Sequence, residues 1–310
     1  MDMPNDTRPL KIGTRGSALA LAQAHETRDR LTAAHGLTPG AIEIVVIKTT
    51  GDRVLDRPLS EIGGKGLFTR EIEDAMLSGE IDIAVHSCKD MPTVQPDGLV
   101  LDCFLPREDV RDAFVSAEFD SIAALPPGAV VGSSSLRRRA QLAHRRPDLQ
   151  LVEFRGNVQT RLRKLDDGVA VATFLAMAGL NRLGMAHIVR SAISPEDMLP
   201  AVAQGAITVE RRVDDALTAH LLAAIHDPET GIRIAAERAF LARLDGSCQT
   251  PIAGLAEIEG DGLRLRGEIL RPDGSEVIAG ERRGSVGDAA AMGDDLAQEL
   301  LSRAGPGFFG

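Results

Sequence analysis

The stretch that decides the fold reads Ile81-Asp82-Ile83-Ala84-Val85-His86-Ser87-Cys88-Lys89-Asp90-Met91-Pro92. Its first half is apolar and rich in β-branched residues, as in a strand covered on both faces of a parallel sheet. Polar and reactive side chains follow at once, and Pro92 ends the strand. Ligands of open α/β sheets bind beyond the carboxyl ends of strands, so a site is predicted around His86 and Asp90. A purely structural alternative is that Asp90 caps a helix or pairs with Lys89, and that His86 is a satisfied interior histidine.

Strands and helices alternate around this stretch. Before it, the sequence predicts strands over 10–14 and 42–49 and helices over 18–34 and 68–78. Ser17 suits the N-cap of the first helix and Gly36 suits its end. This order is typical of a parallel sheet with flanking helices.

The alternation restarts after Pro106 and changes character near residue 226. Strands are predicted over 114–116, 130–132, 149–154 and 169–174, and helices over 136–145, 158–165 and 176–183. The segment 194–205 is predicted to return to the first sheet through a strand at 207–210. Beyond it, a helix over 228–244 precedes antiparallel strands over 252–258, 263–270 and 276–283 and a helix over 288–302. The predicted domains are 1–105 with 200–225, then 106–199, then 226–310.

Composition restricts the class of protein. The 310 residues contain no run of 18 apolar residues, and the N-terminal segment has neither a signal-peptide nor a transit-peptide pattern. Three cysteines without Cys-x-x-Cys spacing argue against a disulfide framework or a zinc site. The absence of Trp and Tyr and a net charge of −10 argue against nucleic-acid binding. We therefore expect a cytoplasmic protein with no metal, no membrane and no nucleic-acid partner, and a monomer because no long apolar surface helix calls for a partner.

One segment opposes the overall acidity. From Gly132 to Lys164 the chain has nine Lys or Arg residues and two acidic residues, a local charge of +7. Hydroxyl and amide side chains begin the two helices of this segment, at 133–135 and at Asn157, where a helix N-terminus favours anions. In an acidic protein this segment predicts a pocket for a small polyanion.

Eight motifs in one order carry a family resemblance that runs from about Lys11 to Ile258. They are Thr-Arg-Gly-Ser at 14–17, Gly-Gly-Lys-Gly-Leu-Phe at 63–68, His-Ser-Cys-Lys-Asp at 86–90, Ser-Ser-Leu-Arg-Arg at 134–138, Arg-Gly-Asn-Val-Gln-Thr-Arg-Leu at 155–162, Ala-Gly-Leu-Asn-Arg-Leu-Gly at 178–184, Leu-Pro-Ala-Val-Ala-Gln-Gly-Ala at 199–206 and Gly-Ser-Cys-Gln-Thr-Pro at 246–251. With them the chain resembles the porphobilinogen deaminase (hydroxymethylbilane synthase) family. No single motif would identify the family, but eight of them in this order are highly specific for it.

The resemblance implies an α/β fold of two lobes that look like type II periplasmic binding proteins, with the active site between them, plus a smaller C-terminal α+β domain with an antiparallel sheet. It also implies a dipyrromethane cofactor held covalently by a thioether to Cys248. Such an enzyme adds four porphobilinogen molecules to this primer, releases ammonia each time, and finally frees a linear tetrapyrrole with water. A carboxylate suits this chemistry because loss of ammonia leaves a positively charged pyrrole.

The family motifs also imply roles for individual residues. Asp90 matches the catalytic aspartate and Lys89 lies next to it. Cofactor binding is implied for Cys248, Arg137, Arg138, Ser135, Ser133, Lys89, Ser87 and Asp90. Substrate binding is implied for Arg15, Ser17, Arg155, Arg161, Arg182, Gln204 and Lys65, the last on a flexible loop. Arginine suits these positions because its planar fork binds carboxylates bidentately.

The chain departs from the family pattern at four positions. Ala203 and Ser247 stand where glycine is expected, Val171 stands where an acid is frequent, and Cys88 stands where Met or Leu is common. The first two affect tight backbone turns, and the last adds a second thiol near the predicted site.

Two other functions fit part of the pattern. A two-lobed carboxylate-binding protein without catalysis explains the lobes and the arginines but leaves Asp90 and Cys248 without a role. A transferase that uses Cys248 as nucleophile needs an activating histidine nearby, and no motif supplies one.

Overall fold

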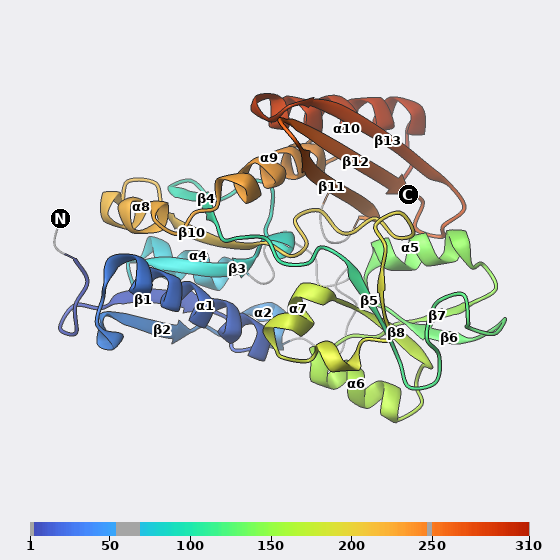
Figure 1. Ribbon diagram of the computed structural model, residues 1–310, viewed down its shortest axis with the longest axis horizontal. Coiled ribbons are helices and arrows are strands. Elements are labelled where there is room, and N and C mark those ends of the chain that lie inside the picture. Colours follow the sequence, from blue (N-terminus) through green and yellow to red (C-terminus); the bar gives the residue numbers. More distant parts are fainter. Residues whose placement is uncertain (1–2, 54–68, 247–249, 310) are drawn as a thin grey trace. The chain divides into compact units, whose positions relative to one another are not determined.

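The computed structural model describes residues 3–53, 69–246 and 250–309, which form two compact units. The first unit comprises Met1–Glu108 and Ala206–Gly231, and the second comprises Asp109–Gly205 and Ile232–Gly310. Figure 1 shows the helices and strands of both. Lys65, Ser247 and Cys248 lie outside the described residues.

The first unit is built on a five-stranded sheet with the order β2-β1-β3-β10-β4. Its elements are β1 (Leu10–Thr14), α1 (Ala18–His35), β2 (Ile42–Val46), α2 (Thr50–Arg53), α4 (Arg70–Leu77), β3 (Ile83–Ser87), β4 (Leu99–Phe104), β10 (Ile207–Arg212) and α8 (Ala216–Ala223). Strands β2, β1 and β3 are parallel, but β10 is antiparallel to both β3 and β4. The expected return of 207–210 to the first sheet is confirmed. The predicted parallel sheet is confirmed for β2, β1 and β3. The direction of β10 was not predicted; it is antiparallel, because β10 returns from the second unit and antiparallel pairing needs no crossover helix.

The caps of α1 follow the sequence. The Ser17 hydroxyl accepts a hydrogen bond from the Ala20 N–H at 3.2 Å, and Gly36 adopts a left-handed conformation with a φ of 60°. A side-chain acceptor satisfies one of the free N–H groups at the helix start, and glycine reaches positive φ without steric strain. Both predicted caps are confirmed.

The second unit contains a sheet of the same design, with the order β7-β6-β8-β5-β9. Its elements are β5 (Asp112–Ser116), β6 (Val130–Gly132), α5 (Leu136–Arg145), β7 (Gln150–Val152), α6 (Val158–Asp166), β8 (Ala172–Ala176), α7 (Met177–Arg182) and β9 (Ser191–Ile193). Strands β7, β6 and β8 are parallel, and β5 is antiparallel to β8 and β9. Phe114 and Phe174 meet edge to face in the core, with ring centroids 5.8 Å apart.

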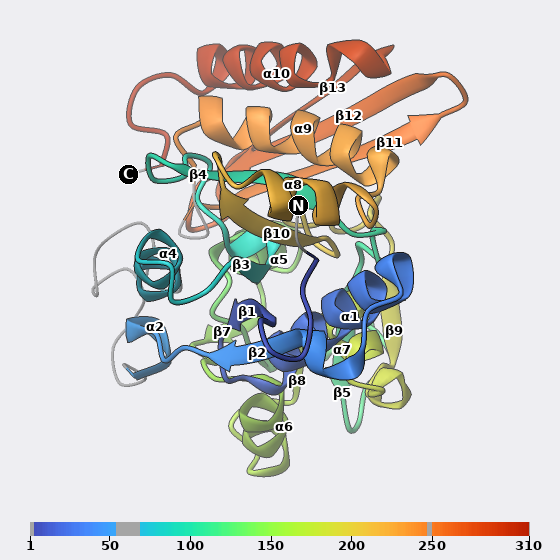
Figure 2. The ribbon, with the colours of Figure 1, turned by 90° about the vertical axis from the view of Figure 1, so that its left-hand side faces the viewer.

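The same unit also contains a three-stranded antiparallel sheet with two long helices beside it (Figure 2). Its elements are α9 (Pro228–Arg243), β11 (Ile252–Glu259), β12 (Gly262–Leu270), β13 (Val277–Ser285) and α10 (Ala289–Ala304). A Cβ atom at Gly267 of β12 would lie 2.5 Å from Phe240 of α9 and 3.1 Å from Leu296 of α10. Glycine at this position therefore lets both helices pack against the strand.

Four of these elements have no counterpart in the prediction: α2, β4, β9 and α8. Strands β4 and β9 lie at the edges of their sheets, and β9 has only three residues. Short edge strands carry little hydrophobic alternation, so periodicity does not reveal them. Among the described residues no helix has the length and apolar character needed to cross a bilayer.

The turn at Ala203 is strained. This buried residue has a φ of 61°, in the left-handed region, and its N–H donates to Glu237 Oε2 at 2.6 Å. The structure thus confirms a tight turn where the family pattern has glycine. We expect Ala203→Gly to raise the free energy of unfolding by about 0.5–1 kcal/mol, because relief of left-handed strain exceeds the added backbone entropy of glycine.

Urea unfolding measures this change, with Ala201→Gly as the matched control. Ala201 lies in the same turn without a positive φ, so glycine there is expected to destabilise the protein. A destabilised Ala203→Gly variant would contradict the strain.

Candidate functional site

A pocket of about 70 Å³ in the first unit gathers four residues predicted for the site. Parallel neighbours β1 and β3 end at Thr14 and Ser87, so the residues that follow them meet at one edge of the sheet. The polar lining of the pocket consists of Arg15, Ser17, Gln23, Thr69, His86, Ser87 and Asp90. A pocket therefore lies beyond the ends of β1 and β3, and Arg15, Ser17, Ser87 and Asp90 are part of its lining.

Neighbouring contacts hold the rim of this pocket. Gln23 Nε2 donates to the Ser87 hydroxyl at 2.8 Å. Residues Cys88–Asp90 form one 3₁₀ turn, and the Cys88 N–H donates to the Ala206 carbonyl at 3.0 Å. Asp90 is exposed at the end of this turn, whereas the Cys88 side chain is buried in the core. The extra thiol at Cys88 therefore does not face solvent beside the site.

His86 behaves as a paired interior histidine. Its side chain is buried, and Nε2 lies 3.2 Å from Oε2 of the fully buried Glu210. Burial raises the pKa of the neighbouring Glu73, and the charge of Glu210 raises it further. The expectation that His86 stands at the mouth of the site is only partly met: it lines the pocket from within the strand.

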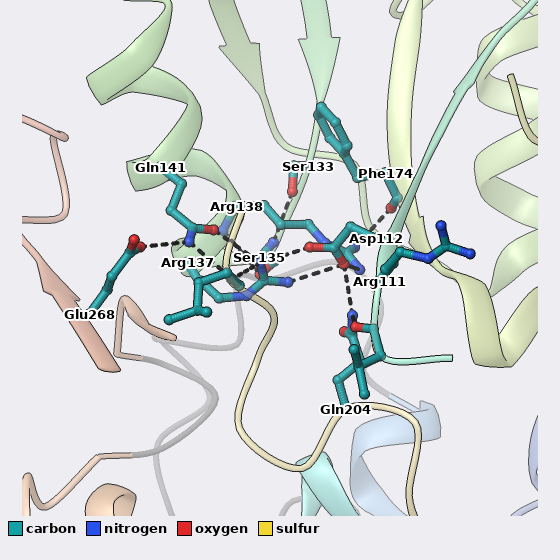
Figure 3. Close-up of polar contacts among 12 residues, drawn as sticks. Arg111, Asp112, Ser133, Ser135, Arg137, Arg138, Gln141, Phe174, Gln204 and Glu268 are labelled. Carbon is teal, nitrogen blue, oxygen red and sulfur yellow. Dashed lines mark hydrogen bonds and ion pairs between the residues drawn. The ribbon is translucent and has the colours of Figure 1, made fainter. Parts of the chain in front are cut away.

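The cationic segment of the second unit converges on an acid that lies outside it (Figure 3). Arg137 Nη1 donates to Asp112 Oδ2 at 2.8 Å, and Arg138 donates to Asp112 Oδ1 through Nε at 3.1 Å and through Nη2 at 2.7 Å. All three residues are buried. Two guanidinium groups thus share one carboxylate, and the cluster retains one positive charge.

Asp112 is ionised in this environment. Burial of its carboxyl would raise its pKa, but the charges of Arg137 and Arg138 lower the pKa well below its usual range. Gln204 Nε2 adds a hydrogen bond to Asp112 Oδ1 at 3.0 Å. The network therefore contains three residues predicted for the site together with a carboxylate that was not predicted.

Ser133 and Ser135 are placed at the start of α5, as predicted. The Ser135 hydroxyl accepts from the Arg138 N–H at 3.4 Å and caps the helix, and Ser133 Oγ accepts from the Ser135 N–H at 3.3 Å. Ser133 is buried and Ser135 is half-buried. Both hydroxyl oxygens act as acceptors here, so each can still donate its proton to an anion.

A second cationic turn surrounds Arg155. Lys164 Nζ donates to the Arg155 carbonyl at 3.0 Å, and Arg161 Nε donates to the Gly156 carbonyl at 2.9 Å. Asn157 caps α6 by accepting from the Thr160 N–H at 2.9 Å. One guanidinium nitrogen of Arg155, Nη1, is buried and has no hydrogen-bond partner among the residues that the structure describes. Arg161 therefore supports the backbone of this turn, while Arg155 keeps a free donor.

Arg182 occupies a position near the Gln204 loop. Its Nη2 donates to the Gly205 carbonyl at 3.1 Å, next to the residue that contacts Asp112. The predicted site residues thus fall into a pocket in the first unit and two cationic clusters in the second. The predictions for Lys65 and Cys248 concern residues outside the described ones.

Sequence reasoning missed Asp112 and Glu210. Each is an acid in an otherwise apolar strand: Asp112 precedes Ala113-Phe114-Val115, and Glu210 follows Ile207-Thr208-Val209. Since an acid is rarely buried without a partner, a single acid in such a strand is the signal that would have revealed them.

Comparison with known proteins gives consistent matches. The family model "Porphobilinogen deaminase, dipyromethane cofactor binding domain" matches residues 10–220, and "Porphobilinogen deaminase, C-terminal domain" matches residues 232–302. Porphobilinogen deaminase of Paracoccus denitrificans is 78% identical over 99% of this chain and 98% of its own length. The chloroplastic porphobilinogen deaminase of Pisum sativum is 57% identical over 98% of this chain and 84% of its own length.

The chloroplastic porphobilinogen deaminase of Oryza sativa is 55% identical over 97% of this chain and 85% of its own length. Together the two family models span both units of the structure. The chain belongs to the porphobilinogen deaminase family.

Proposed function

We propose that the chain condenses four porphobilinogen molecules head to tail, with loss of ammonia, onto a covalently bound dipyrromethane primer. Water then releases linear hydroxymethylbilane for tetrapyrrole biosynthesis. The observation that carries this proposal is the match of both family models, one of them named for the cofactor, to nearly the whole chain. We further propose a three-domain enzyme that works as a monomer in the cytoplasm. In the part of the chain that the structure describes, Cys103 is a buried thiol outside any disulfide, which supports a reducing compartment.

The second unit has suitable donors for the cofactor. Dipyrromethane has two pyrrole rings, each with an acetate and a propionate, so its binding site must supply several cationic donors. Within residues 3–53, 69–246 and 250–309, the buried atoms Arg137 Nε and Arg155 Nη1 have no hydrogen-bond partner, and the cluster around Asp112 retains one positive charge. Buried donors of this kind are costly unless an acceptor reaches them, which supports carboxylate binding here.

These residues are proposed to hold the cofactor through its carboxylates. Arg137, Arg138, Ser133 and Ser135 supply side-chain donors, and Cys248 is the attachment point. When bound, the cofactor supplies the pyrrole ring carbon to which the first substrate is joined. Cys103 is a poor alternative anchor because burial raises its thiol pKa to about 12.

The first unit is proposed to act on the substrate. The Asp90 carboxylate stabilises the positive charge that develops on porphobilinogen as ammonia leaves, and it accepts the proton that the attacked ring carbon loses when the new bond forms. Arg15 and Ser17 lie in the same pocket and bind the substrate carboxylates. Lys89, the residue before Asp90, adds positive charge to this edge of the sheet for the substrate carboxylates.

The remaining predicted residues are proposed to bind carboxylates of the growing product. Arg155 is assigned this role directly, since its buried Nη1 has no hydrogen-bond partner among the described residues. Arg182, Gln204 and Lys65 are assigned it by their family motifs. Arg161 is proposed to act mainly through the turn that carries Arg155, because its Nε is bonded to the Gly156 carbonyl.

The intact mass of the denatured chain tests the proposal. The chain made in a host that supplies porphobilinogen is expected to exceed its sequence mass by a two-pyrrole adduct. Brief exposure to porphobilinogen is expected to add a ladder of single-pyrrole increments. Cys248→Ser is expected to abolish both, whereas the matched controls Cys88→Ser and Cys103→Ser retain them. An unmodified mass without a ladder would indicate a binding protein, and an adduct that persists in Cys248→Ser would assign the anchor to another thiol.

Arg155→Lys is expected to lower kcat/KM by roughly tenfold to a hundredfold and to change the free energy of unfolding by less than about 1 kcal/mol. Lysine keeps the charge but cannot bind a carboxylate with two parallel N–H groups. Steady-state kinetics and urea unfolding measure the two effects. Arg163→Lys is the control, because Arg163 is exposed on α6, the helix that follows the Arg155 turn. Unchanged kinetics in Arg155→Lys would remove Arg155 from the substrate site.

A further inference from the structure

A glutamine links the cationic cluster to the three-stranded sheet (Figure 3). The buried Gln141 of α5 accepts a hydrogen bond at Oε1 from Arg137 Nη1 at 3.0 Å. Its Nε2 donates to the Leu199 carbonyl at 3.0 Å and to Glu268 Oε2 at 2.9 Å. Both N–H groups and the oxygen of the amide are therefore used, and these contacts fix the orientation of the amide.

Arg137 is held by the same group of contacts. Besides Asp112 and Gln141, its Nη1 contacts the Leu199 carbonyl at 3.1 Å. Its Nε is buried, and no described residue accepts a hydrogen bond from it. The Nη1 side of the guanidinium group is thus committed to the protein framework, while Nε remains a donor for a ligand.

Glu268 belongs to the strand pair that follows the predicted anchor in sequence. It lies on β12 opposite Ala253 of β11, and β11 begins at Ile252, four residues after Cys248. The segment 199–200, whose Leu199 carbonyl accepts from Gln141, is fixed to β11. The Gly254 N–H donates to the Pro200 carbonyl at 3.0 Å, and Leu199 packs with Ala253. Two sets of contacts therefore join Arg137 to the start of β11.

We propose that Gln141 and Glu268 are positioning residues, which hold Arg137 in register with the β11–β12 strand pair that follows Cys248. This inference rests on the proposed function, in which Arg137 binds a carboxylate of the dipyrrole that Cys248 attaches. A ligand that is held at two points attaches readily only when the two points keep a fixed separation. The Glu268–Gln141–Arg137 series supplies that separation through hydrogen bonds whose directions are fixed.

The rate of cofactor attachment tests this role without relying on turnover. Chain made in a host that lacks porphobilinogen is incubated with porphobilinogen, and the two-pyrrole adduct is followed by intact mass. Glu268→Ala is expected to slow adduct formation about fivefold, the effect of losing one hydrogen bond. Glu268→Gln keeps the length of the side chain and an acceptor oxygen at its end. Its rate of adduct formation is therefore expected to stay within about twofold of the wild-type rate.

The control is Glu281→Ala, which removes an exposed ion pair with Arg264 from the same sheet. It is expected to form the adduct at the wild-type rate. Gln141→Leu is expected to be slow as well, and Gln141→Leu with Glu268→Ala no slower than Gln141→Leu alone, because both residues act through Arg137. Additive losses would indicate two unrelated structural defects and would overturn the inference.

The outcomes separate the inference from the proposed function. A wild-type chain that gains no adduct contradicts the proposed function and, with it, the inference. A wild-type chain that gains the adduct, together with Glu268→Ala at the same rate, contradicts the inference alone. A lower urea midpoint in Glu268→Ala with an unchanged rate of adduct formation would make Glu268 a structural residue only.

Discussion

Asp112→Ala is expected to lower the free energy of unfolding of the second unit by about 3–5 kcal/mol. The change leaves Arg137 and Arg138 buried without their carboxylate, and an unpaired buried charge is among the most destabilising defects in a protein. Because Gln204 also loses its acceptor Oδ1, its buried amide has one hydrogen bond fewer. Urea unfolding followed by circular dichroism measures the effect.

Asp109→Ala is the matched control for Asp112. Asp109 also pairs with an arginine, but the Arg111 side chain is 43% exposed, against 4% for Arg137. Removal of an ion pair of this kind is expected to change the free energy of unfolding by less than about 1 kcal/mol. Equal effects of the two substitutions would show that Asp112 does not neutralise its cluster.

The Asp112 network also predicts a dependence on pH. The pKa of Asp112 is lowered in the folded protein, so its stabilising contribution is fully present above the unfolded pKa of about 3.9 and is lost as the pH falls through the folded value. The difference in stability between the wild type and Asp112→Asn is therefore expected to be constant from pH 5 to 8 and to shrink below about pH 4. Paired urea titrations at several pH values test this, and a difference that disappears near pH 6 would contradict it.

Asp90→Asn is expected to reduce kcat by about 10²–10³-fold with little change in stability. Asparagine keeps the shape of the side chain but removes the charge that stabilises a developing cation and the base that accepts a proton. Asp90 is exposed at the end of a 3₁₀ turn, so its loss leaves no buried group unpaired. Ammonia release under saturating porphobilinogen measures kcat.

Asp97→Asn is the control for Asp90. Asp97 is an exposed acid seven residues further along the chain, and it does not line the pocket. The Asp97→Asn substitution is expected to leave kcat unchanged. If Asp90→Asn retained at least a third of the wild-type kcat, Asp90 would no longer qualify as the catalytic carboxylate.

Local signals in the sequence predicted most of the fold. Strand β6 and helix α5 have the bounds that were expected, because three serines separate a buried strand from an amphipathic helix. The caps at Ser17 and Gly36 follow from the same kind of local chemistry. The antiparallel course of β10 could not be predicted in this way, since pairing direction depends on where the chain returns from.

In the candidate site, too, local features could be predicted from the sequence and long-range contacts could not. Arg15, Ser17, Ser87 and Asp90 could be placed together because parallel strands end at one edge of a sheet. The charge of the segment 132–164 predicted a pocket for a small polyanion, but not that two of its arginines are buried and paired with Asp112, which lies outside that segment. Glu268 follows Gln141 by 127 residues, and no spacing in the sequence indicates such a contact.

The strand order of the first unit has a consequence for synthesis on the ribosome. Strand β10 lies between β3 and β4, yet it is made only after the whole segment Asp109–Gly205. A nascent chain that ends before Ala206 therefore has β3 with one unpaired edge and β4 without its neighbour in the sheet. Unpaired edges of hydrophobic strands favour aggregation, and domains made of separated segments fold late. This interval of translation is when the chain most needs protection by a chaperone.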